Sequence, residues 1–217
     1  MRIGRFVCIS LLSCAPGWAV TVLGTSSCSF AQGLSGISTT AQSWSSTGAY
    51  GNVGVSVNVG TTDPGGSVSA WLMTAIGSGT TTASQIAATT FTPPTVANFL
   101  TAPPATALFS GLTLAPGTYY LVLSTTSGAG AWAMCASTAT DTGVTFNGAN
   151  LAFGGLNSGF PPASGFSPTG RVFGMQVTGT VSTAVPALGT VPLVLLTMLL
   201  MILGWRFLSV SQHRVNS

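Results

Sequence analysis

Very few side chains in the middle of this 217-residue chain could perform acid–base chemistry. Between residues 20 and 180 the charged side chains are Asp63, Asp141 and Arg171, and that stretch contains no His, Lys or Glu. General acid–base catalysis needs such a side chain held close to the reacting atoms. A glycosidase-type pair of carboxylates would have to be Asp63 and Asp141 themselves, 78 residues apart in sequence.

Both aspartates also suit a structural role. Asp63 precedes Pro64 and Gly65, and an aspartate in such a turn commonly caps backbone N–H groups. Asp141 begins a stretch with the composition of a loop. The single histidine, His213, follows a long apolar segment, where we expect it to be solvated. No Ser-His-Asp triad can therefore form in the middle region, and we expect neither an enzyme nor a cofactor.

The middle region also has few side chains that could bind a metal ion or a nucleic acid. Zinc needs clustered Cys and His, and calcium needs several oxygen ligands, so at most a weak calcium site at Asp63 or Asp141 is conceivable. We therefore predict no metal site. One arginine cannot form a patch that binds phosphates, because four of the five arginines lie near the chain ends, and we predict no nucleic-acid partner.

The four cysteines divide into two pairs. Cys8 and Cys14 lie near the N-terminus, which leaves Cys28 and Cys135 in the middle region. In an oxidising compartment these two would form a disulfide. That bond would close a loop of about 108 residues and stabilise the fold by roughly 4 kcal/mol. The alternative is a pair of buried free thiols.

Aromatic side chains offer the remaining binding chemistry, because their faces stack on sugar rings. Trp44 and Tyr50 lie in a Ser/Gly-rich segment and are the candidate exposed residues for ligand stacking. Most of the other aromatic residues alternate with apolar neighbours, which favours packing in a core. These are Trp71, Tyr119, Tyr120 and Trp132.

The N-terminus has the pattern of a secretory signal peptide. Arg2 and Arg5 precede the apolar run Phe6–Leu12, and small residues follow at Gly17 and Ala19. We expect cleavage after Ala19, so that residues 1–19 are removed. An alternative is lipidation, because the residues 11–14 (LLSC) resemble the lipobox of bacterial lipoproteins.

The C-terminus has the length of a membrane span. Ala184 to Trp205 contains 22 residues without a charge, and at about 1.5 Å per residue a helix of that length crosses a bilayer core. Trp205 suits the interface, and Arg206 and Arg214 suit the cytoplasmic side. We predict a transmembrane helix at about 187–207 within a terminal segment 181–217. A buried core helix is the alternative, although little else in the chain has a helical pattern.

These last residues also carry a family resemblance. Val185-Pro186-Ala187-Leu188, followed by an apolar helix and a basic end, resembles the IPTL-CTERM variant of the PEP-CTERM-type sorting signals on exosortase substrates. The class usually has a Trp-Gly pair where Val191-Pro192 stands here. The resemblance implies export by a Gram-negative bacterium, a stay in the inner membrane, and processing by an exosortase toward the cell surface or extracellular matrix.

Residues 20–180 show the two-residue period of β-strands. Valines alternate with small or polar residues over Val53–Val59, and a turn at residues 63–66 leads to a second run at Val68–Ile76, so these runs are expected to form a hairpin. Thr118–Leu123 is apolar on both faces and should lie centrally in a sheet. Further strands are expected at Ala131–Ala136 and Val172–Val177. The pattern predicts an all-β, antiparallel, jelly-roll-like β-sandwich.

The same region carries a second resemblance. Residues 109–123, which end in GTYYLVL, are similar to a strand common in the ectodomains of exosortase-sorted proteins, and Trp132 and residues 160–164 fit that pattern. It implies an architecture and no particular activity. The sequence thus predicts an exported, non-enzymatic surface or matrix protein with a structural or adhesive role. Its expected partners are an exosortase, the membrane and, as a candidate, a surface polysaccharide. The alternative is a carbohydrate-binding surface module.

Overall fold

The fold is known from a computed structural model, which describes residues 19–34, 38–77, 80–127, 130–153 and 165–182, together with Met198, Leu200 and Met201. These residues are mostly β-strand with almost no helix, as the sequence predicts. The strands are β1 Val20–Leu34, β2 Ser38–Ser46, β3 Tyr50–Thr61, β4 Ser67–Met73, β5 Gln85–Phe91, β6 Ala105–Leu114, β7 Gly117–Ser127, β8 Gly130–Thr140, β9 Val144–Phe153, β10 Phe166–Pro168 and β11 Met175–Val181, with a short 3₁₀ helix η1 at Thr82–Ser84.

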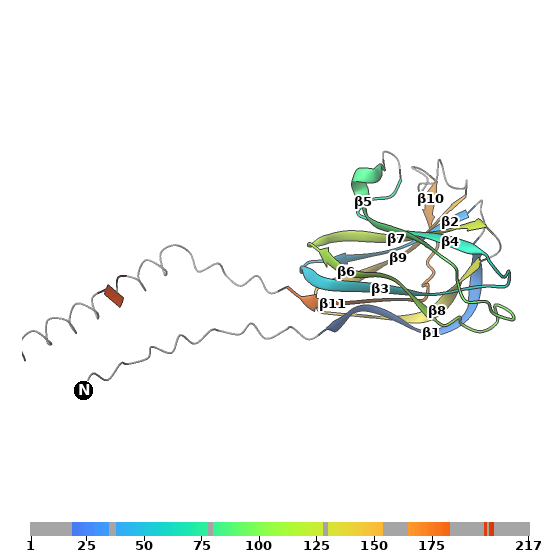
Figure 1. The fold of residues 1–217 in the computed structure, drawn as a ribbon, viewed down its shortest axis with the longest axis horizontal. Helices are drawn as coiled ribbons and strands as arrows, with labels where there is room; N and C mark the ends of the chain where they lie inside the picture. Colours follow the sequence, from blue (N-terminus) through green and yellow to red (C-terminus); the bar gives the residue numbers. More distant parts are fainter. Residues whose placement is uncertain are drawn as a thin grey trace, which may run out of the picture. The chain divides into compact units, whose positions relative to one another are not determined.

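The strands form two antiparallel sheets, drawn as two layers in Figure 1. One sheet has five strands in the order β11-β1-β8-β3-β6, and the other has six in the order β10-β9-β2-β7-β4-β5. Four pairings are nested in the sequence: β4 with β5, β3 with β6, β2 with β7, and β1 with β8. The pairs alternate between the sheets: β4 with β5 and β2 with β7 lie in the six-stranded sheet, whereas β3 with β6 and β1 with β8 lie in the five-stranded sheet.

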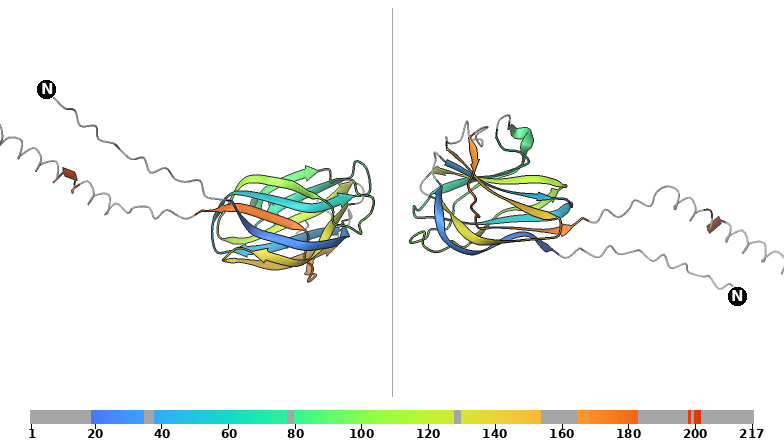
Figure 2. Two further views of the ribbon diagram at one scale, coloured as in Figure 1. Left: turned by 90° about the horizontal axis from the view of Figure 1, so that it is seen from below. Right: turned by 180° about the vertical axis from the view of Figure 1, so that it is seen from behind.

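The last strand brings the two ends of the strand-forming region together. β11 pairs with both β1 and β3, and Val20 at the start of β1 lies opposite Gly179 near the end of β11. Both ends therefore leave the sheets at one end of the layered body, which can be followed in Figure 2.

The larger of two hydrophobic clusters contains residues from both sheets. Along β3 the side chains of Val53, Val55, Val57 and Val59 are buried while the residues between them are partly exposed, because successive side chains in a strand point to opposite faces. The same core contains Leu121 and Leu123 of β7 from the other sheet. β7 lies between β2 and β4, which confirms the prediction of a central strand.

The predicted hairpin between residues 53–59 and 68–76 is wrong. β3 belongs to the five-stranded sheet and β4 to the six-stranded sheet, so the turn at residues 62–66 passes from one sheet to the other. β4 pairs with β5 on one side and with β7 on the other. Nearly every β4 side chain is buried, because both faces of the strand are covered: Val68, Ala70 and Leu72 belong to one cluster, and Trp71 and Met73 to another. β4 also ends at Met73, three residues before the predicted end.

The expected strand at Val172–Val177 begins only at Met175. The preceding residues cross between the sheets, where Phe173 forms a single antiparallel bridge with Met134 of β8, and a side chain bonds to the backbone groups of Phe173. The Gln42 side chain donates from Nε2 to the Phe173 carbonyl (2.9 Å), and the Phe173 N–H donates to Gln42 Oε1 (2.5 Å). Gln42 thus satisfies both backbone groups of a buried residue in the crossing segment.

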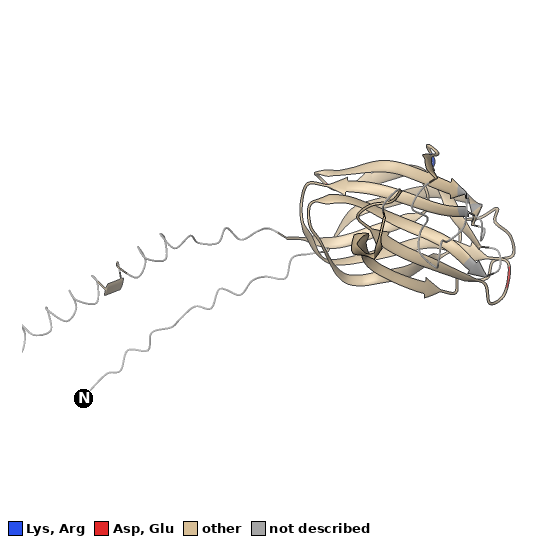
Figure 3. Ribbon diagram, turned by 90° about the horizontal axis from the view of Figure 1, so that it is seen from above, with Lys and Arg blue, Asp and Glu red and all other residues tan. Residues whose placement is uncertain are grey.

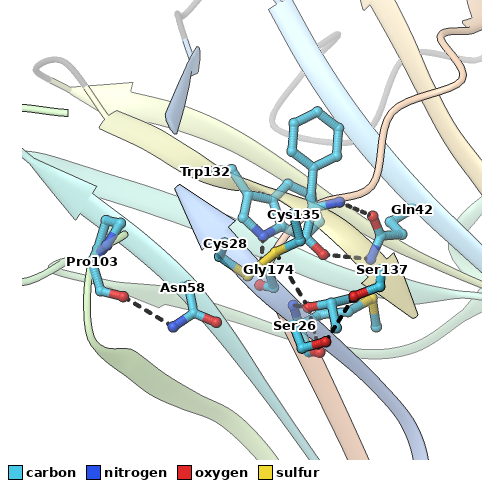
Figure 4. The surroundings of a disulfide bond; sticks show 12 residues. Ser26, Cys28, Gln42, Asn58, Pro103, Trp132, Cys135, Ser137 and Gly174 are labelled. Carbon is cyan, nitrogen blue, oxygen red and sulfur yellow. Dashed lines mark hydrogen bonds between the residues drawn. A yellow bond between two sulfur atoms is a disulfide. The ribbon is translucent and has the colours of Figure 1, made fainter. Parts of the chain in front are cut away.

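The residue after Phe173 occupies a crowded position. Trp132 Nε1 and the Asn58 N–H both donate to the Gly174 carbonyl, each at 2.8 Å, as Figure 4 shows for Trp132. A Cβ at Gly174 would lie 2.8 Å from the Cβ of Asn58, so glycine permits the close approach. The Trp132 ring also stacks on Phe173 with centroids 4.9 Å apart.

The predicted targeting segments lie outside the described residues. These are the signal peptide at 1–19, of which only Ala19 is described, and the sorting motif Val185-Pro186-Ala187-Leu188. Of the expected transmembrane helix, only Met198, Leu200 and Met201 are described, and they are helical. No helix within the described part of the chain is long and apolar enough to cross a membrane.

Candidate functional site

The two aspartates do not come together. Thr61, two residues before Asp63, pairs with Gly130 at the start of β8, whereas Asp141 directly follows the end of β8. At about 3.3 Å per residue, the length of β8 separates them by roughly 30 Å. The catalytic pair required by the enzyme hypothesis is therefore not formed. Figure 3 shows how little of the described chain is charged.

Each aspartate takes part in local structure. The Asp63 carbonyl accepts a hydrogen bond from the Gly66 N–H, which closes the turn between the sheets. The Asp141 carboxylate accepts from the Thr142 N–H at 2.8 Å and from the Tyr50 hydroxyl at 3.0 Å. No group of three or more His, Cys, Asp or Glu side chains suited to a metal occurs in the described ranges.

Burial raises the pKa of Tyr50 above its usual value of 10.0, and the hydrogen bond to Asp141 and the negative charge of that carboxylate add to the rise. A raised pKa in the folded state means that the neutral tyrosine stabilises the fold. This stabilisation is complete below the unfolded pKa of about 10 and is lost as the pH rises through the folded value.

We predict that Tyr50→Phe makes stability less sensitive to alkali. In urea titrations above about pH 10, the unfolding free energy of wild type should fall more steeply with pH than that of Tyr50→Phe. Asp141→Asn, which keeps an acceptor but removes the charge, should give an intermediate slope. Identical slopes for all three proteins would show that this pair does not titrate with folding.

The two aromatic residues expected to be exposed are buried, so that prediction is wrong. Trp44 is 0% exposed and Tyr50 is 3% exposed. Trp44 points into the core beside its cross-strand partner Tyr119, with ring centroids 5.7 Å apart. The serines on either side of Trp44 lie on the opposite face of β2, because successive side chains in a strand point to opposite faces. The Ser-rich segment is therefore a strand with one apolar and one polar face, and not an exposed loop.

A different face of the molecule is hollowed. An open depression of about 490 Å³ lies on the six-stranded sheet. It is lined by Ser43, Ile76, Gly77, Tyr120, Asn147, Asn150, Gly165 and Phe166. Ser43 and Tyr120 are cross-strand partners that alternate with the core residues Gln42 and Leu121, so the depression is on the outer face, away from the core. We call it the outer-face hollow.

The polar groups of the outer-face hollow are neutral, and some of them have no hydrogen-bond partner among the described residues. Ser43 donates to the Gly148 carbonyl at 3.2 Å, and Asn147 Nδ2 donates to Ser45 Oγ at 2.7 Å. The Asn150 side chain and the Tyr120 hydroxyl make no hydrogen bond to any other described residue. The hollow therefore offers amide donors, an amide acceptor and a phenol without a charged side chain in its lining.

A small apolar cluster lies beside this hollow. Its buried members are Ala41, Trp71, Met73 and Val122, and Ile76, Tyr120 and Phe166 pack against it. Trp71, 5% exposed, also lines a second depression of about 270 Å³ together with Ser69, Ala88, Thr89 and Thr90. Both depressions lie on the same sheet, one over β2, β7, β9 and β10 and the other over β4 and β5.

Sequence reasoning named Tyr120 and Trp71 among the aromatic residues but assigned them to the core, and it did not find Phe166, Asn147 or Asn150. The sequence of β7 does indicate a second covered surface, because its apolar residues occupy both faces of the strand. One face of such a strand must be covered by something other than the shared core, and here Tyr120 and Val122 lie on that second face.

The predicted cysteine pair lies at disulfide distance. The Sγ atoms of Cys28 and Cys135 are 1.95 Å apart and the Cα atoms are 3.8 Å apart, where β1 pairs with β8 (Figure 4). The bond joins residues 107 positions apart in sequence.

No protein-family model matches this chain, and a comparison with curated proteins gives no match.

Proposed function

We propose that this chain is an exported, non-enzymatic protein of the bacterial cell surface or extracellular matrix, with a structural or adhesive role. The observation that carries the proposal is the Cys28–Cys135 pair at bonding distance. Disulfides persist in oxidising compartments and are rare in the cytosol. The separation of Asp63 from Asp141 supports a non-enzymatic role, because these were the residues on which an acid–base mechanism would depend.

The proposed architecture is a β-sandwich of the jelly-roll type. The nested pairings of β1 to β8 support it, since a jelly roll places four such pairs alternately in two sheets. In this proposal β9, β10 and β11 are additions that widen the two sheets. A nearly uncharged body of this kind suits a building block that is displayed and does not turn over a substrate.

The proposed route is delivery by the C-terminal sorting signal of a Gram-negative bacterium. Its support is the sequence of residues 184–217, which resembles an exosortase substrate. The adjacency of Val20 and Gly179 also suits display, because a body with both ends at one end can be tethered there while its far end stays accessible. The processing enzyme and the inner membrane are the partners in this proposal.

We predict that Pro186→Ala blocks processing. An enzyme that cuts at the membrane face needs an extended recognition segment, and proline prevents the helix from starting earlier. Full-length precursor should therefore accumulate in the inner membrane, as followed by fractionation and mass spectrometry. Pro192→Ala is the matched control and should be processed like wild type.

The sorting proposal is contradicted if Pro186→Ala behaves like wild type. If wild type and Pro186→Ala fractionate identically and both retain Arg214, the segment is a plain single-pass anchor. In that case the sorting proposal fails, while the prediction of an exported domain remains.

A carbohydrate-binding role is the second candidate. Its original basis, exposure of Trp44 and Tyr50, is removed by their burial. The observation that favours it now is the outer-face hollow, with aromatic rings and neutral hydrogen-bonding groups.

A further inference from the structure

We propose that β5 pairs antiparallel with β5 of a second copy of this chain, so that the six-stranded sheets of two copies join into one. This inference names a partner for the structural role proposed above and rests on that role for its biological meaning. Export and C-terminal processing are separate questions, because the pairing depends only on the folded domain.

Among the described strands, β5 is the sheet edge that lacks a device against further pairing. In the five-stranded sheet, β11 pairs with both β1 and β3, and β6 pairs with β3 through three shifts of register. In the six-stranded sheet, β10 has only three residues and ends in Pro168, which has no N–H to donate. Irregular register, short strands and proline keep other chains from adding to an edge. β5 has none of these over Ala87–Phe91, where its pairing with β4 is regular.

The sequence of β5 suits pairing with a copy of itself. Its seven residues read QIAATTF, with no charge, no proline and no glycine. Segments of that length and composition pair readily with identical segments when they are exposed at an edge. A partner strand rich in Lys or Glu would find no opposite charge on β5, and this chain contains neither residue, so a second copy brings no such charge.

The outer face beside β5 leaves room for the side chains of an added strand. Ala88 and Thr90 are exposed on this face, whereas Ala87 and Phe91 pack against the larger hydrophobic cluster. Ala88 and Thr90 also line the depression of about 270 Å³ that Trp71 borders. Opposite side chains on neighbouring strands lie about 4.5–5.5 Å apart, so a strand added at this edge would place its side chains at the rim of that depression.

The geometry of this pairing limits assembly to two copies. The outer side of β5 has no ladder partner within the described ranges, and a second β5 would supply the missing hydrogen-bonding groups. Two identical antiparallel strands are related by a twofold axis, and each uses its edge once. Because the other edges carry blocking devices, the paired sheets offer no edge to a third copy.

The test is photo-crosslinking of the full-length chain in a Gram-negative host, with p-benzoylphenylalanine in place of Thr90. We expect one main product with twice the mass of a single chain. Two differently tagged copies, produced together, should both occur in it, and mass spectrometry should find the cross-link between their β5 strands. The product should form in whichever compartment contains the folded domain, so a failure of export and a failure of pairing give different results.

Charged variants test the pairing directly. Ala88→Lys should lower the yield of this product about tenfold or more, because pairing would bring two ammonium groups together near the twofold axis. Producing Ala88→Lys together with Ala88→Glu should restore the product, because the two charges then attract. Ala107→Lys is the matched control on β6, the exposed edge of the other sheet, and should cross-link like wild type.

The proposal is overturned if the probe at Thr90 forms no product with a second copy, or if it joins only a different protein. Products mainly larger than two chains would also contradict it, as would equal yields for wild type and Ala88→Lys. If the mixture of Ala88→Lys and Ala88→Glu fails to restore the product while both variants resist protease as wild type does, the two β5 strands do not face each other.

Discussion

Gln42→Met should lower the free energy of unfolding by about 2–3 kcal/mol. The Gln42 side chain is fully buried, and its amide pairs with both the N–H and the carbonyl of Phe173. Methionine has a similar size and fills the space, but it leaves two buried backbone groups without partners. Urea unfolding followed by tryptophan fluorescence measures the loss.

Gln176→Met provides the control for this substitution. Gln176 is exposed on β11, so the same change should alter stability by no more than about 0.5 kcal/mol. If both variants lose the same amount, the bond between Gln42 and Phe173 does not hold the crossing segment in place. A loss confined to Gln42→Met supports the assignment.

Removal of the disulfide is expected to have the largest effect. The free energy of unfolding of the double variant Cys28→Ala, Cys135→Ala should be about 4 kcal/mol lower than that of wild type. The bond joins residues 107 positions apart, and a link across so long a loop removes much entropy from the unfolded chain. Equilibrium unfolding without reductant gives the difference.

Reduction of the wild-type protein supplies an independent check. With the bond cut by a thiol reagent, wild type should unfold at the same denaturant concentration as the double variant, and the reagent should not affect that variant. If reduction leaves the denaturant midpoint of wild type unchanged, and if two thiols react in the unfolded protein without reductant, then the two cysteines are free thiols.

The strands with strict alternation could be predicted from the sequence, whereas several others could not. In β3 each valine faces the core, so the pattern and the structure agree. In β2 the residues are mostly small and polar, yet Thr39, Thr40 and Ser43 are buried. Their burial comes from neighbouring strands far away in sequence, and that information is absent from the local pattern.

The candidate site was hidden for the same reason. Asn150, Tyr120 and Phe166 come from β9, β7 and β10, and only the order of strands in the sheet brings them to one face. The partner of Gln42 lies 131 residues away, so its role in the core could not be predicted either. The sequence predicts the turn at residues 63–66, but turn chemistry does not say whether the next strand joins the same sheet.

The central claim is that this domain is exported and matured outside the cytosol. The most direct measurement is the intact mass of the protein isolated from the cell envelope without reductant. The account predicts a chain that begins at Val20, has lost Arg214 with the rest of its basic end, and carries two hydrogens fewer because Cys28 and Cys135 are joined. A chain that begins at Met1 and retains both thiols would contradict it.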